Sequence, residues 1–204
     1  MPRLVVNDED ELLQEMPETW GDLLAVLEQT AARRGEVVTA VRFDGVDEPT
    51  FAGAAAAGRA LAGTDTIEVE TAGLHELIDQ ALAQGSLAVG VLSTAATQTG
   101  EAFRGADLAG ANQRLAELSE GIRSLLSVLG TGATAVGVDL TRMEWDGRPV
   151  AARMRELSGQ LEAIVEAQES RDWLTVADIL QYDFEPALTG WQPIFEALRS
   201  AIPA

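Results

Sequence analysis

The 204-residue chain contains no cysteine. It also contains no lysine, and all 14 of its basic residues are arginines. Without cysteine there are no disulfides, thiolate metal sites, iron–sulfur clusters or cysteine nucleophiles. Without lysine there is no phosphate-binding loop of the Walker type and no Schiff-base lysine. These two absences exclude several large classes of enzyme chemistry.

Histidine is nearly absent as well, since His75 is the only one. Glu76 and Asp79 lie close to it in sequence, but a hydrolytic zinc site usually needs two or three histidines. The chain has no GxSxG, HExxH or GxGxxG motif. We therefore expect no catalytic residue, no metal site, no cofactor and a non-enzymatic role, with an enzyme of unknown class as the less favoured alternative.

Positive charge is scarce and scattered, and the formal net charge is −19. Arg33 and Arg34 are the only adjacent basic pair. Binding to a nucleic-acid backbone needs clustered basic residues that release counterions. We expect no nucleic-acid binding, and the acidity favours a basic partner.

Long apolar runs are also missing. The longest apolar stretch, around residues 82–92, is interrupted by Gln84, Gly85 and Ser86 and is too short to span a bilayer. Residues 1–10 are acidic and lack the apolar core of a signal peptide. We expect a soluble, cytoplasmic protein without membrane insertion.

Residues 1–71 are expected to form a small α/β domain. Thr19 followed by Asp22 is typical of a helix start, and Asp44-Gly45 is typical of a turn. The acidic run over residues 8–11 is expected to be a solvated loop. We expect strands at residues 3–7, 12–13, 37–43 and 66–70, a helix from Thr19 to Gly35, and a short helix or loop at 52–62.

This order of strand, short strand, helix, strand and strand resembles the ubiquitin-like β-grasp domains. The resemblance implies a small mixed sheet but no single function, because many functions share that fold. Sulfur-carrier members need a terminal Gly-Gly, whereas this chain ends in Ile202-Pro203-Ala204, and ferredoxin members need cysteines. We expect a binding or structural module.

After Glu70 the hydrophobic period changes to that of a helix, so residues 72–204 are expected to form an all-α bundle of four to five helices. The fold class is therefore α+β. Residues 136–150 are expected to be an extended connector. The glycines of the first two expected helices predict close helix–helix approach, with a hinge as the alternative; they are Gly85, Gly90, Gly100, Gly130, Gly132 and Gly137. The expected helices span residues 74–103, 108–136, 150–168, 172–184 and 187–202.

Residues 172–195 hold five of the ten aromatic side chains. One interpretation is closure of the bundle core, because aromatic residues at helical spacing are usually buried. The other interpretation is a partner-binding groove that has an aromatic rim and an acidic edge. In this groove residues 178, 182 and 185 share a face. The candidate partner-binding residues are Trp173, Asp178, Tyr182, Glu185, Trp191 and Phe195.

The same segment is similar to the ending of uncharacterised bacterial proteins that join a small β-grasp-like unit to a helical region. The similarity lies in an Ala-Asp pair, an apolar pair, a Tyr-Asp pair, a proline and a tryptophan. It implies a fold and a bacterial origin but no activity. The matching positions are Ala177, Asp178, Ile179, Leu180, Tyr182, Asp183, Pro186 and Trp191.

These observations favour a protein-interaction, adaptor or assembly protein of a bacterial complex. The alternative is a secretion or flagellar-type export chaperone that shields an apolar helix of its client. In that case replacement of Trp191 should weaken client binding more than replacement of Trp20. The sequence leaves the partner and the oligomeric state open.

Overall fold

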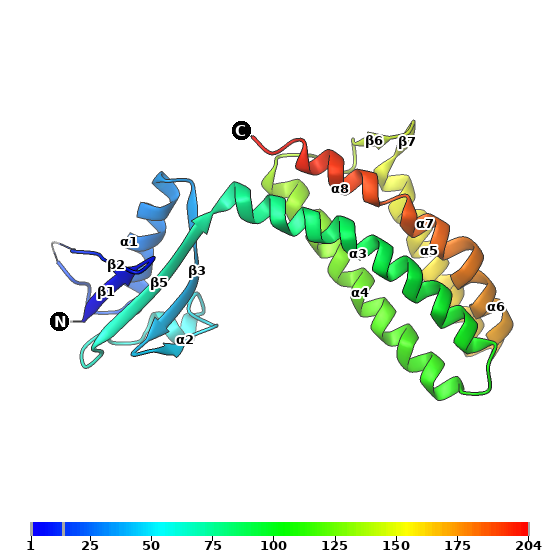
Figure 1. Ribbon diagram of the computed structural model, residues 1–204, viewed down its shortest axis with the longest axis horizontal. Helices are drawn as coiled ribbons and strands as arrows, with labels where there is room; N and C mark the ends of the chain where they lie inside the picture. The colour runs from blue at the N-terminus through cyan, green and yellow to red at the C-terminus, as the bar shows by residue number, and fades with distance from the viewer. Residues whose placement is uncertain (1, 14, 204) are drawn as a thin grey trace. The chain divides into compact units, whose positions relative to one another are not determined.

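The computed structural model describes residues 2–13 and 15–203. Contacts within the chain define two compact units, residues 1–77 and 78–204. A small sheet occupies the first unit and helices dominate the second (Figure 1). The expected α+β class is confirmed. In the described part of the chain, no helix is both long and apolar enough to cross a membrane.

The first unit is a five-stranded mixed sheet with one long helix packed against it (Figure 1). The strand order is β2-β1-β5-β3-β4, with β1 parallel to β5 and the other pairs antiparallel. The elements are β1 Arg3–Val6, β2 Glu9–Asp10, α1 Trp20–Arg33, β3 Glu36–Phe43, β4 Val46–Asp47, α2 Ala54–Ala57 and β5 Thr66–Gly73.

The second strand differs from the expectation. Asn7 and Asp8 both have positive φ, 49° and 66°, and so form a two-residue turn of the kind that closes hairpins. The chain reverses at once, and Glu9 and Asp10 pair with β1. The predictions of a strand at residues 12–13 and of a loop over 8–11 were therefore wrong, and Leu12 is 93% exposed.

Helix α1 begins as the sequence predicts. The Thr19 hydroxyl accepts a hydrogen bond from the Asp22 backbone N–H at 3.3 Å and so caps the helix. Trp20 is fully buried, stacks edge-on against Phe43 at 5.1 Å between ring centroids, and donates its indole N–H to the Phe51 carbonyl at 2.8 Å. This cluster anchors α1 on the sheet.

The helical unit contains a long antiparallel pair, α3 and α4, with the remaining helices running alongside (Figure 1). The Asp107 carboxylate caps α4 by accepting from the Gly110 N–H at 3.0 Å. The elements are α3 Leu74–Phe103, α4 Leu108–Ala135, β6 Glu144–Trp145, β7 Arg148–Pro149, α5 Val150–Glu169, α6 Trp173–Asp178, the π-helix η1 Ile179–Phe184, α7 Glu185–Thr189 and α8 Gln192–Arg199.

Three of the predicted glycines, Gly85, Gly100 and Gly132, allow close helix packing, and a Cβ on Gly100 would lie 2.7 Å from Gln181 Cγ. A Cβ on Gly132 would lie 2.6 Å from Leu82 Cδ2, and one on Gly85 would lie 2.8 Å from Phe195 Cδ1. The prediction of close approach is confirmed at these positions. Gly90 and Gly130 have no heavy atom within 4 Å of such a Cβ, so packing does not require glycine there.

The C-terminal segments contain more helices than expected. Pro186 lacks an N–H and crowds the preceding turn, which the chain accommodates by widening into η1 instead of breaking. The Glu185 N–H accordingly donates to the Leu180 carbonyl, five residues back. The expected helix over residues 187–202 is divided because Gly190 ends α7 and Pro193 starts α8.

The predicted extended character of the connector over residues 136–150 is found only at residues 144–149, which form a short hairpin, whereas residues 136–137 and 140–142 are turns and Val150 begins α5. Asp146 and Gly147 have positive φ of 52° and 67° and close the two-residue hairpin β6–β7. Pro149 precedes the first residue of α5.

Helices α3 and α8 are joined by a bidentate ion pair. The Arg199 Nε and Nη2 atoms lie 2.8 and 3.0 Å from the two carboxylate oxygens of Asp79. The hydrogen bond from Arg199 lowers the pKa of Asp79 below its ordinary value of 3.8. A carboxyl whose pKa is lower in the folded state stabilises the fold above its unfolded pKa, and this contribution is lost as the pH falls below that value.

We therefore expect Asp79→Asn to lower the urea midpoint of unfolding at pH 7 and to have a smaller effect at about pH 2.5. Glu162→Gln, at an exposed position on α5, is the control and should leave both midpoints unchanged. An equal loss at both pH values would show that the Asp79 side chain contributes by packing and not by its charge.

Candidate functional site

The six predicted partner-binding residues do not form one surface. Trp191 and Phe195 are 1% and 0% exposed and belong to the core of the helical unit. Trp173 is half-buried and stacks on Phe103, with 5.8 Å between ring centroids. For these three rings the structure shows bundle closure.

The three polar members, residues 178, 182 and 185, lie near α3 or near Arg104, the residue that follows α3. Asp178 forms an ion pair with Arg104, whose guanidinium lies 5.8 Å from the Tyr182 ring centroid. Glu185 accepts a hydrogen bond from the Ser93 hydroxyl at 2.6 Å. Asp178 and Glu185 therefore hold α6 and α7 against α3, whereas Tyr182 remains 66% exposed.

An open apolar groove lies between α3 and α4, with a cavity volume of about 500 Å³. Leu92 and Leu125 form its buried floor, and the rim includes Leu87 and Val91, which are 66% and 69% exposed. The lining contains no charged side chain and consists of Ala81, Gln84, Gly85, Leu87, Ala88, Val91, Leu92, Gly121, Ser124, Leu125 and Val128.

Small residues make the groove deep enough to receive side chains. A Cβ on Gly121 would lie 2.5 Å from Leu92 Cδ2, so α4 approaches α3 closely at this point. Ala88 and Ser124 add little bulk on either side. A row of large side chains from another helix can enter such a depression.

Charged residues on α4 lie near one end of the groove. Glu117 and Glu120 lie within the turn that precedes Gly121. Both are exposed, and Glu120 pairs with Arg123 at 2.9 Å. Glu117 is therefore the acidic residue of this turn without an ion pair among the described residues.

The sequence carries a signal for this groove in the apolar pattern of α3. The segment 74–103 has large apolar residues on more than one helical face, including Leu87 and Val91 outside the stripe that continues through Leu82. A helix that is apolar around most of its circumference must bury two faces or leave one exposed. Here α3 packs against both α4 and α8 and leaves the face that carries Leu87 and Val91 exposed.

His75 lies exposed in the first turn of α3. Within residues 2–13 and 15–203, no three histidine, aspartate or glutamate side chains are grouped so that they could hold a metal ion.

Residues 89–194 match a family described as a domain of unknown function (DUF8042). The matched segment runs from the middle of α3 to the beginning of α8 and spans just over half of the chain. Comparison with curated proteins and with solved structures finds no match. The chain therefore belongs to the DUF8042 family, whose function is not established.

Proposed function

We propose that this chain is a protein-interaction module that holds an amphipathic helix of a partner protein in the α3–α4 groove. The observation that carries the proposal is the exposure of Leu87 and Val91 beside a channel floored by Leu92 and Leu125. Exposed apolar side chains that cluster over a depression are typical of interaction surfaces. A groove between two antiparallel helices is suited to a third helix that presents apolar residues at helical spacing.

Charge favours a basic helix as the occupant. The chain has a net charge of −19, and the exposed Glu117 lies one helical turn before Gly121 of the groove. Arginine or lysine residues beside the apolar face of the partner helix would be attracted to this acidic protein. A second copy of the chain is disfavoured because two molecules of this charge repel each other.

Site-specific photo-crosslinking tests the proposal and identifies the occupant. Benzoylphenylalanine is placed at Leu87 in the groove or at Val165, which is 52% exposed on α5. We expect a crosslink from residue 87 to a basic, amphipathic segment of one protein and none from residue 165. Equal capture from both positions, or capture of segments without helical apolar spacing, would contradict a helix-binding groove.

The export-chaperone alternative uses the same groove, because a chaperone of this kind also covers an apolar helix of its client. The two roles differ in the fate of the occupant. An adaptor keeps its partner in a lasting complex, whereas a chaperone releases a client that is then exported. A crosslinked segment from an exported protein favours the chaperone role.

We also propose that the N-terminal unit has a β-grasp-like fold. Its support is the sheet order β2-β1-β5-β3-β4, the parallel pairing of the first and last strands, and the position of α1 between two hairpins. The β-grasp topology has a long helix between its two hairpins. In this proposal the unit serves as a structural or binding module.

A further inference from the structure

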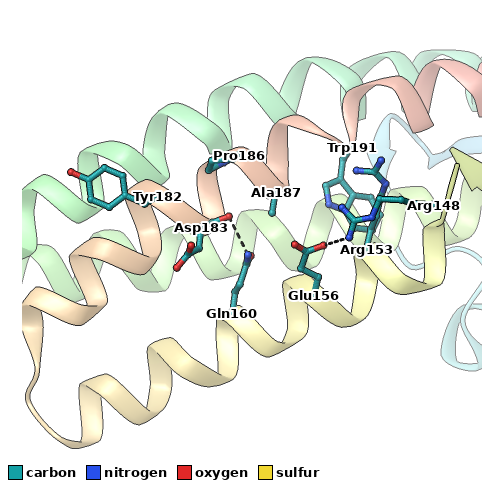
Figure 2. Close-up of a pocket in the computed structure, with 9 residues that line it drawn as sticks. All are labelled: Arg148, Arg153, Glu156, Gln160, Tyr182, Asp183, Pro186, Ala187 and Trp191. Carbon is teal, nitrogen blue, oxygen red and sulfur yellow. Dashed lines mark hydrogen bonds and ion pairs between the residues drawn. The ribbon is translucent and has the colours of Figure 1, made fainter. Parts of the chain in front are cut away.

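A second cavity, of about 320 Å³, lies between α5 and the segment from η1 to the start of α8 (Figure 2). All of its lining residues fall within the family-matched segment 89–194. Its volume is at the lower end of the range for small-molecule sites. The lining consists of Arg148, Arg153, Glu156, Gln160, Tyr182, Asp183, Pro186, Ala187 and Trp191.

One end of the cavity is positively charged. Arg148 donates to Glu156 at 2.7 Å and is neutralised by it. Arg153 has no carboxylate within 4.0 Å in the described part of the chain, although acidic residues outnumber arginines by 33 to 14. Its Nε is buried without a hydrogen-bond partner, and its Nη2 reaches only the Trp145 carbonyl at 3.4 Å.

The opposite end offers acceptors. The Gln160 side-chain N–H donates to the Asp183 backbone carbonyl at 3.1 Å, so the remaining Gln160 atom is the acceptor Oε1. This oxygen is buried and receives no hydrogen bond. Asp183 also lines the cavity, and its carboxylate has no arginine or histidine nitrogen within 4.0 Å among residues 2–13 and 15–203.

Arg153 Nε and Gln160 Oε1 are thus two buried polar atoms without a hydrogen-bond partner. A buried polar atom without a partner costs free energy, so such atoms usually mark a position that a ligand or water fills. Both atoms lie in residues of α5 that line one cavity. The opposite wall includes the end of the π-helix η1, and π-helical turns are frequent at functional sites.

We propose that this cavity binds a small zwitterion, with its carboxylate on Arg153 and its amine on Gln160 Oε1 and Asp183. Arginine and glutamine are seven residues apart on α5, a separation of about 10 Å along the helix axis. The two charges of the ligand therefore lie at opposite ends of a short chain. A doubly charged phosphate is disfavoured because Glu156 and Asp183 line the same cavity.

Titration of the intact, ¹⁵N-labelled chain tests the assignment, with the Trp191 indole N–H signal as readout. The chain has four tryptophans, and Trp191 is the one that lines the cavity. The probes are ε-aminocaproate, hexanoate, hexylamine and inorganic phosphate. We expect a saturable shift with ε-aminocaproate, at least tenfold weaker binding of the two single-charge probes, and no binding of phosphate.

Arg153→Gln should weaken ε-aminocaproate binding at least tenfold, and Arg155→Gln, at an exposed position on the same helix, should not. Asp183→Asn should weaken ε-aminocaproate but leave hexanoate binding unchanged, which keeps the test decisive if the Arg153 variant fails to fold. No saturable Trp191 shift at about 10 mM probe, tighter binding of phosphate, or equal affinity for all three organic probes would overturn the proposal.

Discussion

Replacing Trp191 with alanine is expected to lower the free energy of unfolding of the helical unit by about 3–5 kcal/mol. Trp191 is 1% exposed and lies in the same core cluster as Phe195 and Leu188. Loss of its ring leaves a void that these helices can fill only in part. The measurement is urea unfolding followed by the helical circular dichroism signal.

Trp145→Ala is the matched control, because this tryptophan is 36% exposed on the β6–β7 hairpin. We expect its unfolding midpoint to remain close to that of the unchanged chain. If Trp191→Ala also left the midpoint unchanged, the ring would not be a core residue. An effect of Trp191→Ala on partner binding could then be interpreted as loss of a direct contact.

The second large effect is expected at Gly85, where alanine should destabilise the helical unit by about 2 kcal/mol. The added methyl group would overlap the fully buried ring of Phe195 on α8, 2.8 Å from its Cδ1 atom. The ring has little space to move because its surroundings are packed. This overlap outweighs the helix propensity of about 1 kcal/mol that alanine gains over glycine.

Gly90→Ala provides the comparison within the same helix. Its Cβ would meet no heavy atom within 4 Å, so only the propensity changes and the free energy of unfolding should rise by about 0.5–1 kcal/mol. Thermal or urea unfolding of the two variants measures the difference. Stabilisation by both substitutions would contradict the close contact between α3 and α8.

The sequence was sufficient for elements that depend on local signals. The cap at Thr19 and the turn at Asp44-Gly45 appear where they were predicted, because capping side chains and left-handed turn residues act over three or four positions. The span 74–103 was predicted in full as α3. Long periodic segments are the clearest sequence signal.

Other features depend on contacts distant in sequence. Strand β2 consists of two acidic residues without any alternation, and its existence rests on pairing with β1. The π-helix η1 follows from the position of Pro186 within a helix that the packing around Leu188 keeps continuous. Neither feature has a signature in a short sequence window.

The candidate sites also depend on contacts that are distant in sequence. Aromatic spacing over residues 172–195 indicated an important surface, but it could not separate a core from a groove, and Trp191 and Phe195 are core. The α3–α4 groove is visible only when both helices are in place, since its floor combines Leu92 with Leu125. The unpaired Arg153 could be recognised only from the positions of the surrounding acids.

The most direct test of the helix-binding groove is the affinity of the crosslinked partner segment, made as a fluorescent peptide, for two matched variants. Val91→Glu places a charge in the groove, and Val165→Glu places the same charge on an exposed valine of α5. We expect fluorescence anisotropy to show at least tenfold weaker binding for Val91→Glu and unchanged binding for Val165→Glu. Unchanged binding by Val91→Glu, or an equal loss in both variants, would contradict the groove as the binding site.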